Sequence, residues 1–345
     1  MELIRILSID GGGIRGVIPS RILITLEKLI QEYSGRKDAR IGEYFDFIAG
    51  TSTGGILTAL YLYKDEKRAN RAKFSAEEVY EFYKNEGRDI FYKPIAHIIS
   101  SVMGIRGSKY SSELIEKKAR DIFGDSKLSE LLKPCLITAY DIKSNKTMFF
   151  NQSSAIEDEN KDFYIRDVIK STSAAPTYFE PAIIKSIAKK EYIMIDGGVF
   201  ANNPTMCAYV EASKLKKNIN ANKVIILSLG TGVYKKNYEI NKNSGALKWA
   251  IPLFNINMSG VSDAVDYQLR TTYKSVNKNY YYLRIQGDLS KYPRGTAVMD
   301  NTLDKNIKSL EGVGDDLTKE YKRELDNFAK LLVYEDFTLI RSNNL

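Results

Sequence analysis

The chain has 345 residues, with 51 Lys and Arg against 43 Asp and Glu, a formal net charge of +8 and one histidine. This length fits one large α/β domain, and 43% hydrophobic residues are enough to form a well-covered core. The two cysteines, Cys135 and Cys207, are too few for a disulfide framework or a cysteine metal cluster. Composition thus excludes disulfide-stapled and low-complexity proteins, and favours an ordinary globular one.

Targeting and partner signals are weak. The first residues, MELIRILSID, lack the basic stretch and long apolar run of a signal peptide, and no run of 18 apolar residues could span a bilayer. We therefore expect a cytoplasmic protein that forms a single domain over residues 1–345, with no cofactor and no metal. The modest positive charge fits a solvated surface, or attraction to anionic lipid or a nucleotide. We expect no DNA or RNA polymer as partner, and a homo-oligomer stays open.

The predicted elements alternate between strands and helices. The apolar run at residues 3–9 predicts a strand, and apolar residues at helical spacing predict a helix from residue 17. Ser75 and Glu78 form a capping box that predicts a helix after them. The alternation favours an α/β fold with a central, mainly parallel sheet and helices on both faces. The other predicted elements are a strand at 44–51, helices at 53–63, 111–124 and 165–176, a hairpin at 134–151, a strand at 192–198, a helix from 204 to about 217, and strands at 223–232 and 280–286.

One apolar segment, Phe91–Ile105, does not fit this alternation. It contains Pro94, Gly104 and the only histidine, His97. Two interpretations stay open: the segment is core, or it is a lid over an acyl-binding groove that meets lipid. His97 is interpreted as a packed or partly exposed residue without a catalytic role, because no acid is placed near it.

The first motif that carries chemistry is Gly50-Thr-Ser-Thr-Gly54, the pattern Gly-x-Ser-x-Gly between a predicted strand and a predicted helix. This pattern marks a nucleophile elbow, a sharp turn that exposes a serine and needs glycines because neighbouring backbone packs close to it. Ser52 is therefore a candidate nucleophile. The dipole of the following helix favours negative charge that develops at this position.

The second motif is the segment Asp10–Gly16, DGGGIRG. Three glycines between a strand and a helix can point several backbone N–H groups into one concavity, which would hold a phosphate or the oxyanion of an acyl-transfer intermediate. Arg15 adds positive charge, or is simply a surface arginine. The segment also matches Gly-x-Gly-x-x-Gly, so a Rossmann-type dinucleotide-binding protein stays as an alternative.

The third motif is Asp196-Gly-Gly at the end of a predicted strand. Open α/β sheets place functional groups at the carboxyl ends of their strands, although a plain turn explains this motif equally well.

The order of these motifs resembles the patatin-like phospholipase family, and the segment Ser173–Pro181, SAAPTYFEP, is similar to the family's fourth block. The resemblance covers residues 3–232, with 233–345 as an extension of the same domain. It implies a three-layer patatin-like fold and a Ser-Asp dyad that hydrolyses lipid esters without histidine. The roles that it implies are Ser52 as nucleophile, Asp196 as general base, Gly11, Gly12, Gly13 and Arg15 as oxyanion hole, and Gly50 and Gly54 as elbow glycines.

Two further segments, ILSIDGGGIRGVIPSRIL and Ser259–Leu269, resemble bacterial patatin-like effectors of cyclic-nucleotide anti-phage signalling. That resemblance implies a cyclic dinucleotide activator and a membrane phospholipid substrate at the inner face of the membrane. A lipid acyl hydrolase without nucleotide control is the alternative. A catalytically inactive lipid-binding module is disfavoured because Ser52, Asp196 and the three glycines are all present.

Overall fold

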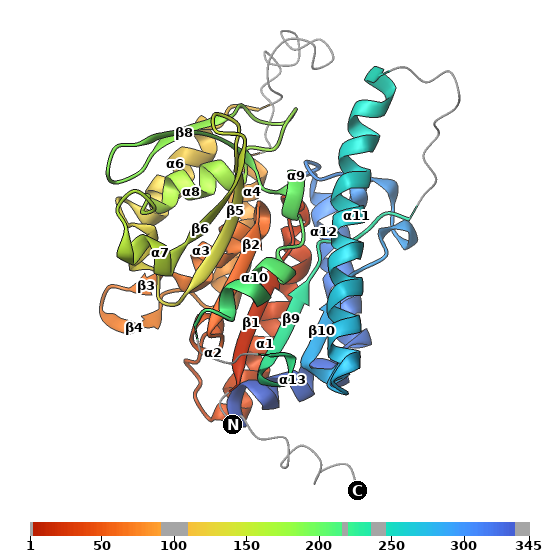
Figure 1. Cartoon of the computed structure of the whole chain (residues 1–345). Coiled ribbons are helices and arrows are strands. Elements are labelled where there is room, and N and C mark those ends of the chain that lie inside the picture. The colour runs from red at the N-terminus through yellow and green to blue at the C-terminus, as the bar shows by residue number, and fades with distance from the viewer. Residues whose placement is uncertain (1–2, 91–109, 216–219, 236–245, 335–345) are drawn as a thin grey trace, which may run out of the picture.

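The computed structural model describes residues 3–90, 110–215, 220–235 and 246–334. Within them, eight strands form one sheet in the order β10-β9-β1-β2-β5-β8-β7, with β6 paired to the other edge of β5 (Figure 1). The strands are β1 (Ile4–Ile9), β2 (Phe47–Thr51), β5 (Cys135–Asp141), β6 (Lys146–Asn151), β7 (Ala182–Lys185), β8 (Glu191–Asp196), β9 (Val224–Leu229) and β10 (Tyr282–Ile285).

The sheet is mainly parallel. The pairs β10–β9, β9–β1, β1–β2 and β2–β5 run parallel, whereas β6, β8 and β7 are antiparallel to their neighbours. The central strands β1 and β9 are apolar along almost their whole length and are buried, as expected for parallel strands covered on both faces. The predicted α/β fold is confirmed.

Helices cover both faces of the sheet (Figure 1). On one face, α1 (Val17–Ser34) packs against α4 (Ala76–Ile90), α12 (Asp304–Glu320) and α13 (Lys322–Tyr334). It does so because its apolar residues recur at helical spacing and form one buried stripe. On the other face lie α10 (Thr205–Ala212) and α11 (Ala246–Ser275). Further helices are α3 (Thr53–Leu62), α6 (Glu113–Phe123), α8 (Ile165–Thr172) and α9 (Gly198–Ala201).

Most predicted elements are present, with some differences. The capping box of α4 forms, with the Glu78 N–H donating to Ser75 Oγ at 3.2 Å. The pattern missed the hairpin of β3 (Lys64–Asp65) and β4 (Arg68–Ala72), the strand β7 and the short helices α2 (Ile41–Tyr44), α7 (Gln152–Glu157) and α9. It also did not predict the length of α11, 30 residues with Pro252 inside. Phe91–Ile105, with His97, lies outside the described residues.

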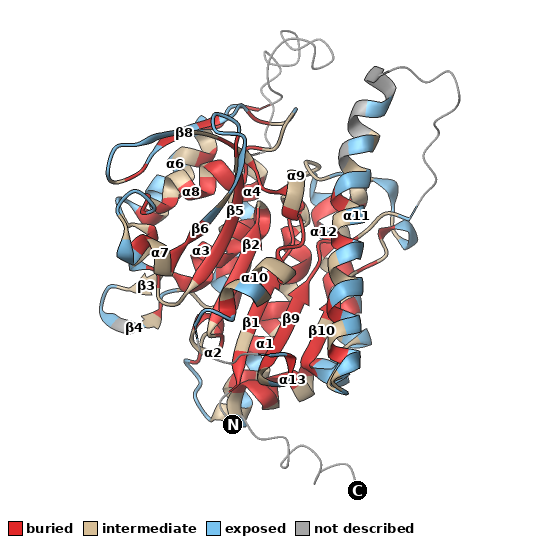
Figure 2. Cartoon of the chain, in the orientation of Figure 1, coloured by how far each residue is buried: buried red, intermediate tan, exposed pale blue. Residues whose placement is uncertain are grey.

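Burial follows the layers. The central strands and the inward faces of the helices are buried, and the outer turns are exposed (Figure 2). None of the described helices combines the length and the apolar character needed to cross a bilayer. At the end of α11 that extends past the other helices, three large apolar side chains are nevertheless exposed: Trp249, Leu253 and Ile256.

Candidate active site

Ser52 occupies the sharp turn between β2 and α3. Its backbone has φ 54° and ψ −120°, a region that a non-glycine residue adopts only when the surroundings enforce it. Both flanking glycines are needed for close packing. A Cβ on Gly50 would lie 2.0 Å from the carbonyl oxygen of Gly54, and a Cβ on Gly54 would lie 2.0 Å from the carbonyl oxygen of Ile9. The turn therefore has the geometry expected of a nucleophile elbow.

Hydrogen bonds of buried threonine hydroxyls hold this turn in place. The Ser52 N–H donates to Thr172 Oγ1 at 2.8 Å, and that hydroxyl donates to the carbonyl oxygen of Thr138 at 2.7 Å. The Thr51 hydroxyl lies 2.7 Å from the Thr138 hydroxyl and donates to the Ala201 carbonyl at 2.6 Å. These buried hydrogen bonds tie the turn to β5, α8 and α9, so the strained backbone at Ser52 is held by three other elements.

Asp196 ends β8 and is only 4% exposed. Its Oδ1 accepts a hydrogen bond from the Gly198 N–H at 2.7 Å. Burial raises the pKa of Asp196 to about 6, and the hydrogen bonds from the Ser52 side chain and the Gly198 amide lower this pKa in part. A carboxylate with a pKa near 6 beside a serine hydroxyl can accept its proton at neutral pH.

In the glycine-rich turn after β1, one backbone amide donates a hydrogen bond within the fold, and two others border the cavity. The Gly11 N–H donates to the carbonyl oxygen of Asn202 at 3.0 Å, so this amide already has a partner, and its place in the oxyanion hole stays a prediction. Gly12 and Gly13 line the same cavity as Ser52 and Asp196. Within the described part of the chain, neither of these two amides donates a hydrogen bond, which leaves both for a ligand.

The conformation of Gly13 is set by its neighbours. It has φ +59°, where glycine is favoured, and its carbonyl oxygen accepts hydrogen bonds from Thr53 Oγ1 and Tyr83 Oη, both at 2.5 Å. The next amide, of Ile14, donates to the carbonyl oxygen of Met299 at 2.8 Å. The turn is therefore held by α3, α4 and the segment before α12.

Arg15 does not line the cavity beside Ser52. Its Nε donates to the Gly12 carbonyl and its Nη1 to the Gly232 carbonyl, each at 3.2 Å, and its side chain faces a second cavity. The guanidinium is therefore bound on the outer side of the turn, and the expected place of Arg15 in the oxyanion hole stays a prediction. Burial lowers the pKa of Arg15 to about 10, so it is a cation at neutral pH.

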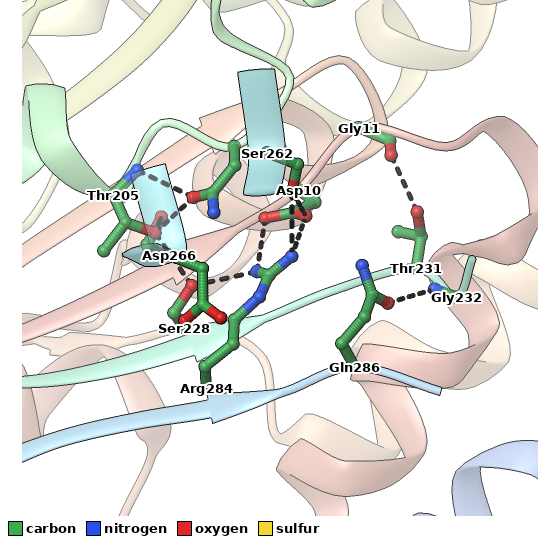
Figure 3. A network of polar contacts seen from close by, with 12 residues as sticks. Asp10, Gly11, Thr205, Ser228, Thr231, Gly232, Ser262, Asp266, Arg284 and Gln286 are labelled. Carbon is green, nitrogen blue, oxygen red and sulfur yellow. Dashed lines mark hydrogen bonds and ion pairs between the residues drawn. The ribbon is translucent and has the colours of Figure 1, made fainter. Parts of the chain in front are cut away.

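A buried ion pair anchors the start of the same turn (Figure 3). Arg284, from β10, donates Nη1 to Asp10 Oδ1 at 2.8 Å and Nη2 to Asp10 Oδ2 at 2.5 Å. The guanidinium also donates to Ser228 Oγ at 2.9 Å and to Ser262 Oγ at 3.1 Å. Both charged side chains are at most 3% exposed. Because the two oxygens of Asp10 are both paired, its charge is compensated inside the core.

The cavity over Ser52 and Asp196 is small, about 70 Å³, and mostly apolar. Its walls include Ile56 and Phe82 from the helices, and Ala175, Tyr178 and Phe179 from the predicted fourth block. Such a wall suits an acyl chain next to an ester carbonyl, because apolar surface favours apolar ligand atoms.

Comparison with known proteins agrees with this geometry. A family model described as patatin-like phospholipase matches residues 7–209. The chain belongs to the patatin-like phospholipase family. It is similar to patatin-like protein 3 of Arabidopsis thaliana, with 33% identity over 92% of this chain and 81% of that protein. It is also similar to patatin-T5 of Solanum tuberosum, with 32% identity over 99% of this chain and 92% of that protein.

Among solved structures, VipD from Legionella pneumophila matches 91% of this chain and 67% of its own, with 13% identity and a TM-score of 0.37. This score is too low to support any argument. Family membership identifies the patatin-like phospholipase as a lipid acyl hydrolase, a carboxylic ester hydrolase. The alternative of a Rossmann-type dinucleotide-binding protein is thereby excluded, since the glycine-rich turn belongs to this family's fold.

Sequence reasoning missed the residues that hold the site together. Thr172 lies within the helix predicted at residues 165–176, but no local pattern signals that its hydroxyl accepts the Ser52 N–H. Tyr83 and Met299 contact the glycine-rich turn from 70 and about 285 residues away along the chain, and no local pattern signals either contact.

Proposed function

We propose that this patatin-like phospholipase hydrolyses the ester bonds of membrane phospholipids with Ser52 as nucleophile and Asp196 as general base. The observation that carries the proposal is a buried carboxylate, with pKa raised to about 6, that lines the same cavity as a serine on a strained turn and whose pKa that serine lowers in part. A serine in this position normally relies on a histidine, and no described residue is one. Asp196 is the group that can take the proton.

The reaction proceeds in two stages. Asp196 accepts the hydroxyl proton as Ser52 Oγ attacks the ester carbonyl, and the amides of Gly12 and Gly13 donate to the oxyanion that forms. Collapse breaks the ester bond, and Asp196 returns the proton to the leaving alcohol. Asp196 then takes a proton from water as the water attacks the acyl-Ser52 ester. The second collapse releases the fatty acid and breaks the bond to Ser52 Oγ, to which Asp196 returns that proton.

The direct experiment is to measure fatty acid release from phospholipid vesicles and to treat the same protein with a fluorophosphonate. The proposal expects fatty acid release together with labelling at Ser52, because only an activated serine reacts at an appreciable rate. Vesicle hydrolysis that persists after complete labelling of Ser52 would show that another nucleophile is responsible.

The exposed apolar stripe on α11 supports a membrane as the location of the substrate. Trp249, Leu253 and Ile256 are 39%, 57% and 38% exposed. Their spacing of four and three residues places them on one side of the helix. Met258, two residues after Ile256 and so on another side of α11, lines the cavity above Ser52. Exposed apolar side chains on a helix that also borders the active-site cavity suit contact with a lipid surface.

Replacing Trp249 and Leu253 by serine should weaken this contact. We expect the ratio of vesicle hydrolysis to hydrolysis of a soluble short-chain ester to fall about tenfold or more, since each exposed side chain would lose ~1–2 kcal/mol of burial in lipid. Tyr267→Ser is the matched control, because Tyr267 is 72% exposed on the same helix but near its other end. Equal ratios in the double variant and in the wild type would contradict a lipid-facing role.

We further propose that a cyclic dinucleotide switches the enzyme on at the inner face of the membrane, in defence of a bacterial cell against phage. The resemblance of Ser259–Leu269 to such effectors and the net charge of +8 support it. Ser262, in this segment, touches the Asp10–Arg284 pair that anchors the glycine-rich turn, so a ligand on α11 could reach the site through it.

A panel of cyclic dinucleotides added to the vesicle assay tests this control. We expect little hydrolysis without nucleotide and a rise of at least tenfold with one member of the panel. Full activity in the absence of every nucleotide would instead support a lipid acyl hydrolase without nucleotide control.

A further inference from the structure

A second cavity adjoins the active site on the other side of the glycine-rich turn. It has a volume of about 500 Å³, several times that of the cavity over Ser52. Tyr178, Met258 and Met299 line both cavities, so the two are separated by single side chains. The second cavity lies beyond the carboxyl ends of β1, β9 and β10, where open α/β sheets bind their ligands.

The charged residues that line this cavity, among those that the structure describes, are all positive. They are Arg15 and Arg294, and none of the described lining residues is an aspartate or a glutamate. Arg15 donates to two backbone carbonyls, and neither arginine forms an ion pair with a carboxylate in the part of the chain that the structure describes. Arg15 is half-buried, and a half-buried cation without a counter-ion is costly unless an anion is bound. Arg294 is exposed and adds a second positive charge at the same wall.

Neutral donors complete the wall. Asn202 is only 7% exposed, yet its Oδ1 has no hydrogen-bond partner, and its side chain faces the cavity. Buried polar groups are normally hydrogen-bonded, so this amide, which can present either its oxygen or its nitrogen, indicates a missing ligand. Gln286 accepts the Gly232 N–H at its Oε1, at 2.7 Å, which leaves its Nε2 as a donor (Figure 3).

We propose that this second cavity binds the phosphoryl group of a phosphodiester, held by Arg294 and Arg15 together with the amides of Asn202 and Gln286. Guanidinium groups and amide N–H donors are the groups that match phosphate oxygens. A phospholipid carries its phosphate and its scissile ester on one glycerol, so a phosphoryl site next to Ser52 fits the headgroup of the lipid being cleaved. A soluble phosphodiester such as a cyclic dinucleotide has the same chemistry. The assignment of the phosphate to a lipid headgroup rests on the proposed function, whereas the phosphoryl site itself does not.

Equilibrium binding in the Ser52→Ala protein tests the site without any need for hydrolysis. The probes are dihexanoylphosphatidylcholine below its micelle concentration, dihexanoylglycerol, which lacks the phosphate, and a panel of cyclic dinucleotides. Adding Arg294→Gln should weaken binding of the phosphatidylcholine about tenfold or more, and it should not weaken binding of dihexanoylglycerol to the same degree. Arg323→Gln is the matched control, an exposed arginine on α13 outside both cavities.

The outcomes separate the sources. A loss confined to phosphatidylcholine assigns the cavity to the lipid headgroup, and a loss confined to a cyclic dinucleotide assigns it to a soluble ligand. Equal affinities for every probe in Arg294→Gln and Arg323→Gln, with Asn202→Ala equally without effect, would overturn the phosphoryl site. Failure of the wild type to release fatty acid from vesicles would reject the proposed hydrolysis, but it would leave these binding results unaffected.

Discussion

Ser52→Ala and Asp196→Asn should each lower the rate of phospholipid hydrolysis by at least about 10³-fold, with the fold intact. Removing the nucleophile of a serine hydrolase leaves only the contribution of the oxyanion hole and of substrate binding. Asparagine can still accept the Gly198 N–H that Asp196 accepts, so the local structure should persist while the base is lost. Initial rates of fatty acid release, with circular dichroism to check the fold, measure the effect. Activity within tenfold of the wild type in either variant would contradict the dyad.

The pKa of Asp196 adds two expected results with definite signs. Because the base must be ionised, kcat/KM should rise with pH around a midpoint near 6. The folded state holds the proton more tightly than the unfolded chain, with a pKa raised from 3.8, so wild-type stability falls as pH rises from about 4 to above 6. Asp196→Asn has no carboxyl group that ionises at this position, so its stability should not fall with pH for this reason.

Denaturant unfolding at two pH values therefore separates the variant from the wild type. At pH 8 Asp196→Asn should have a free energy of unfolding higher by at most about 3 kcal/mol, and at pH 4 the gain should be much smaller. A variant that is less stable than the wild type at pH 8 would show that the buried carboxylate is not the strained group inferred here.

Arg284→Met should destabilise the fold by about 3–5 kcal/mol, the largest effect on stability expected from any substitution considered. The variant would leave the Asp10 carboxyl buried without its counter-ion, and removing one partner of a buried pair costs far more than the pair itself contributes. Ser228 and Ser262 would also lose a donor (Figure 3). Chemical denaturation monitored by the fluorescence of tryptophan and tyrosine gives the free energy of unfolding.

Two companion variants make this result specific. Asp10→Asn combined with Arg284→Met removes both charges and should recover much of the lost stability. Arg270→Met breaks an exposed i,i+4 pair with Asp266 on α11 and should cost no more than about 0.5 kcal/mol. A single Arg284→Met variant as stable as Arg270→Met would mean that water or a neighbouring group compensates Asp10.

The sequence predicts the parts of the fold that follow a local pattern of apolar residues. The continuous apolar runs of β1 and β9 and the stripe of α1 predict a covered parallel sheet, and motifs at strand ends predict where Ser52 and Asp196 lie. It was insufficient for the hairpin β3–β4, whose short polar strands have no apolar alternation. It also missed the length of α11, because Pro252 and the mixed polarity of the helix hide its periodicity.

For the oxyanion site, too, the sequence predicts the general arrangement but not which single N–H groups face the ligand. Glycines in a turn predict a concavity of N–H groups, but which amide faces the ligand depends on which amides have partners elsewhere. The Gly11 amide is taken by Asn202 and the Ile14 amide by Met299, both distant in sequence. Arg15 likewise turns to Gly232. Only the folded chain could assign the free donors to Gly12 and Gly13.

The Asp10–Arg284 pair has a consequence for the order in which activity is acquired during synthesis. Every catalytic motif lies before residue 200, but the counter-ion of Asp10 and the carbonyl that accepts the Ile14 amide arrive only with residues 284 and 299. Until these residues leave the ribosome, Asp10 has no partner for its charge and the turn beside Ser52 has no outer support. This lipid acyl hydrolase would thus be translated in an inactive form and become competent only when its chain is nearly finished.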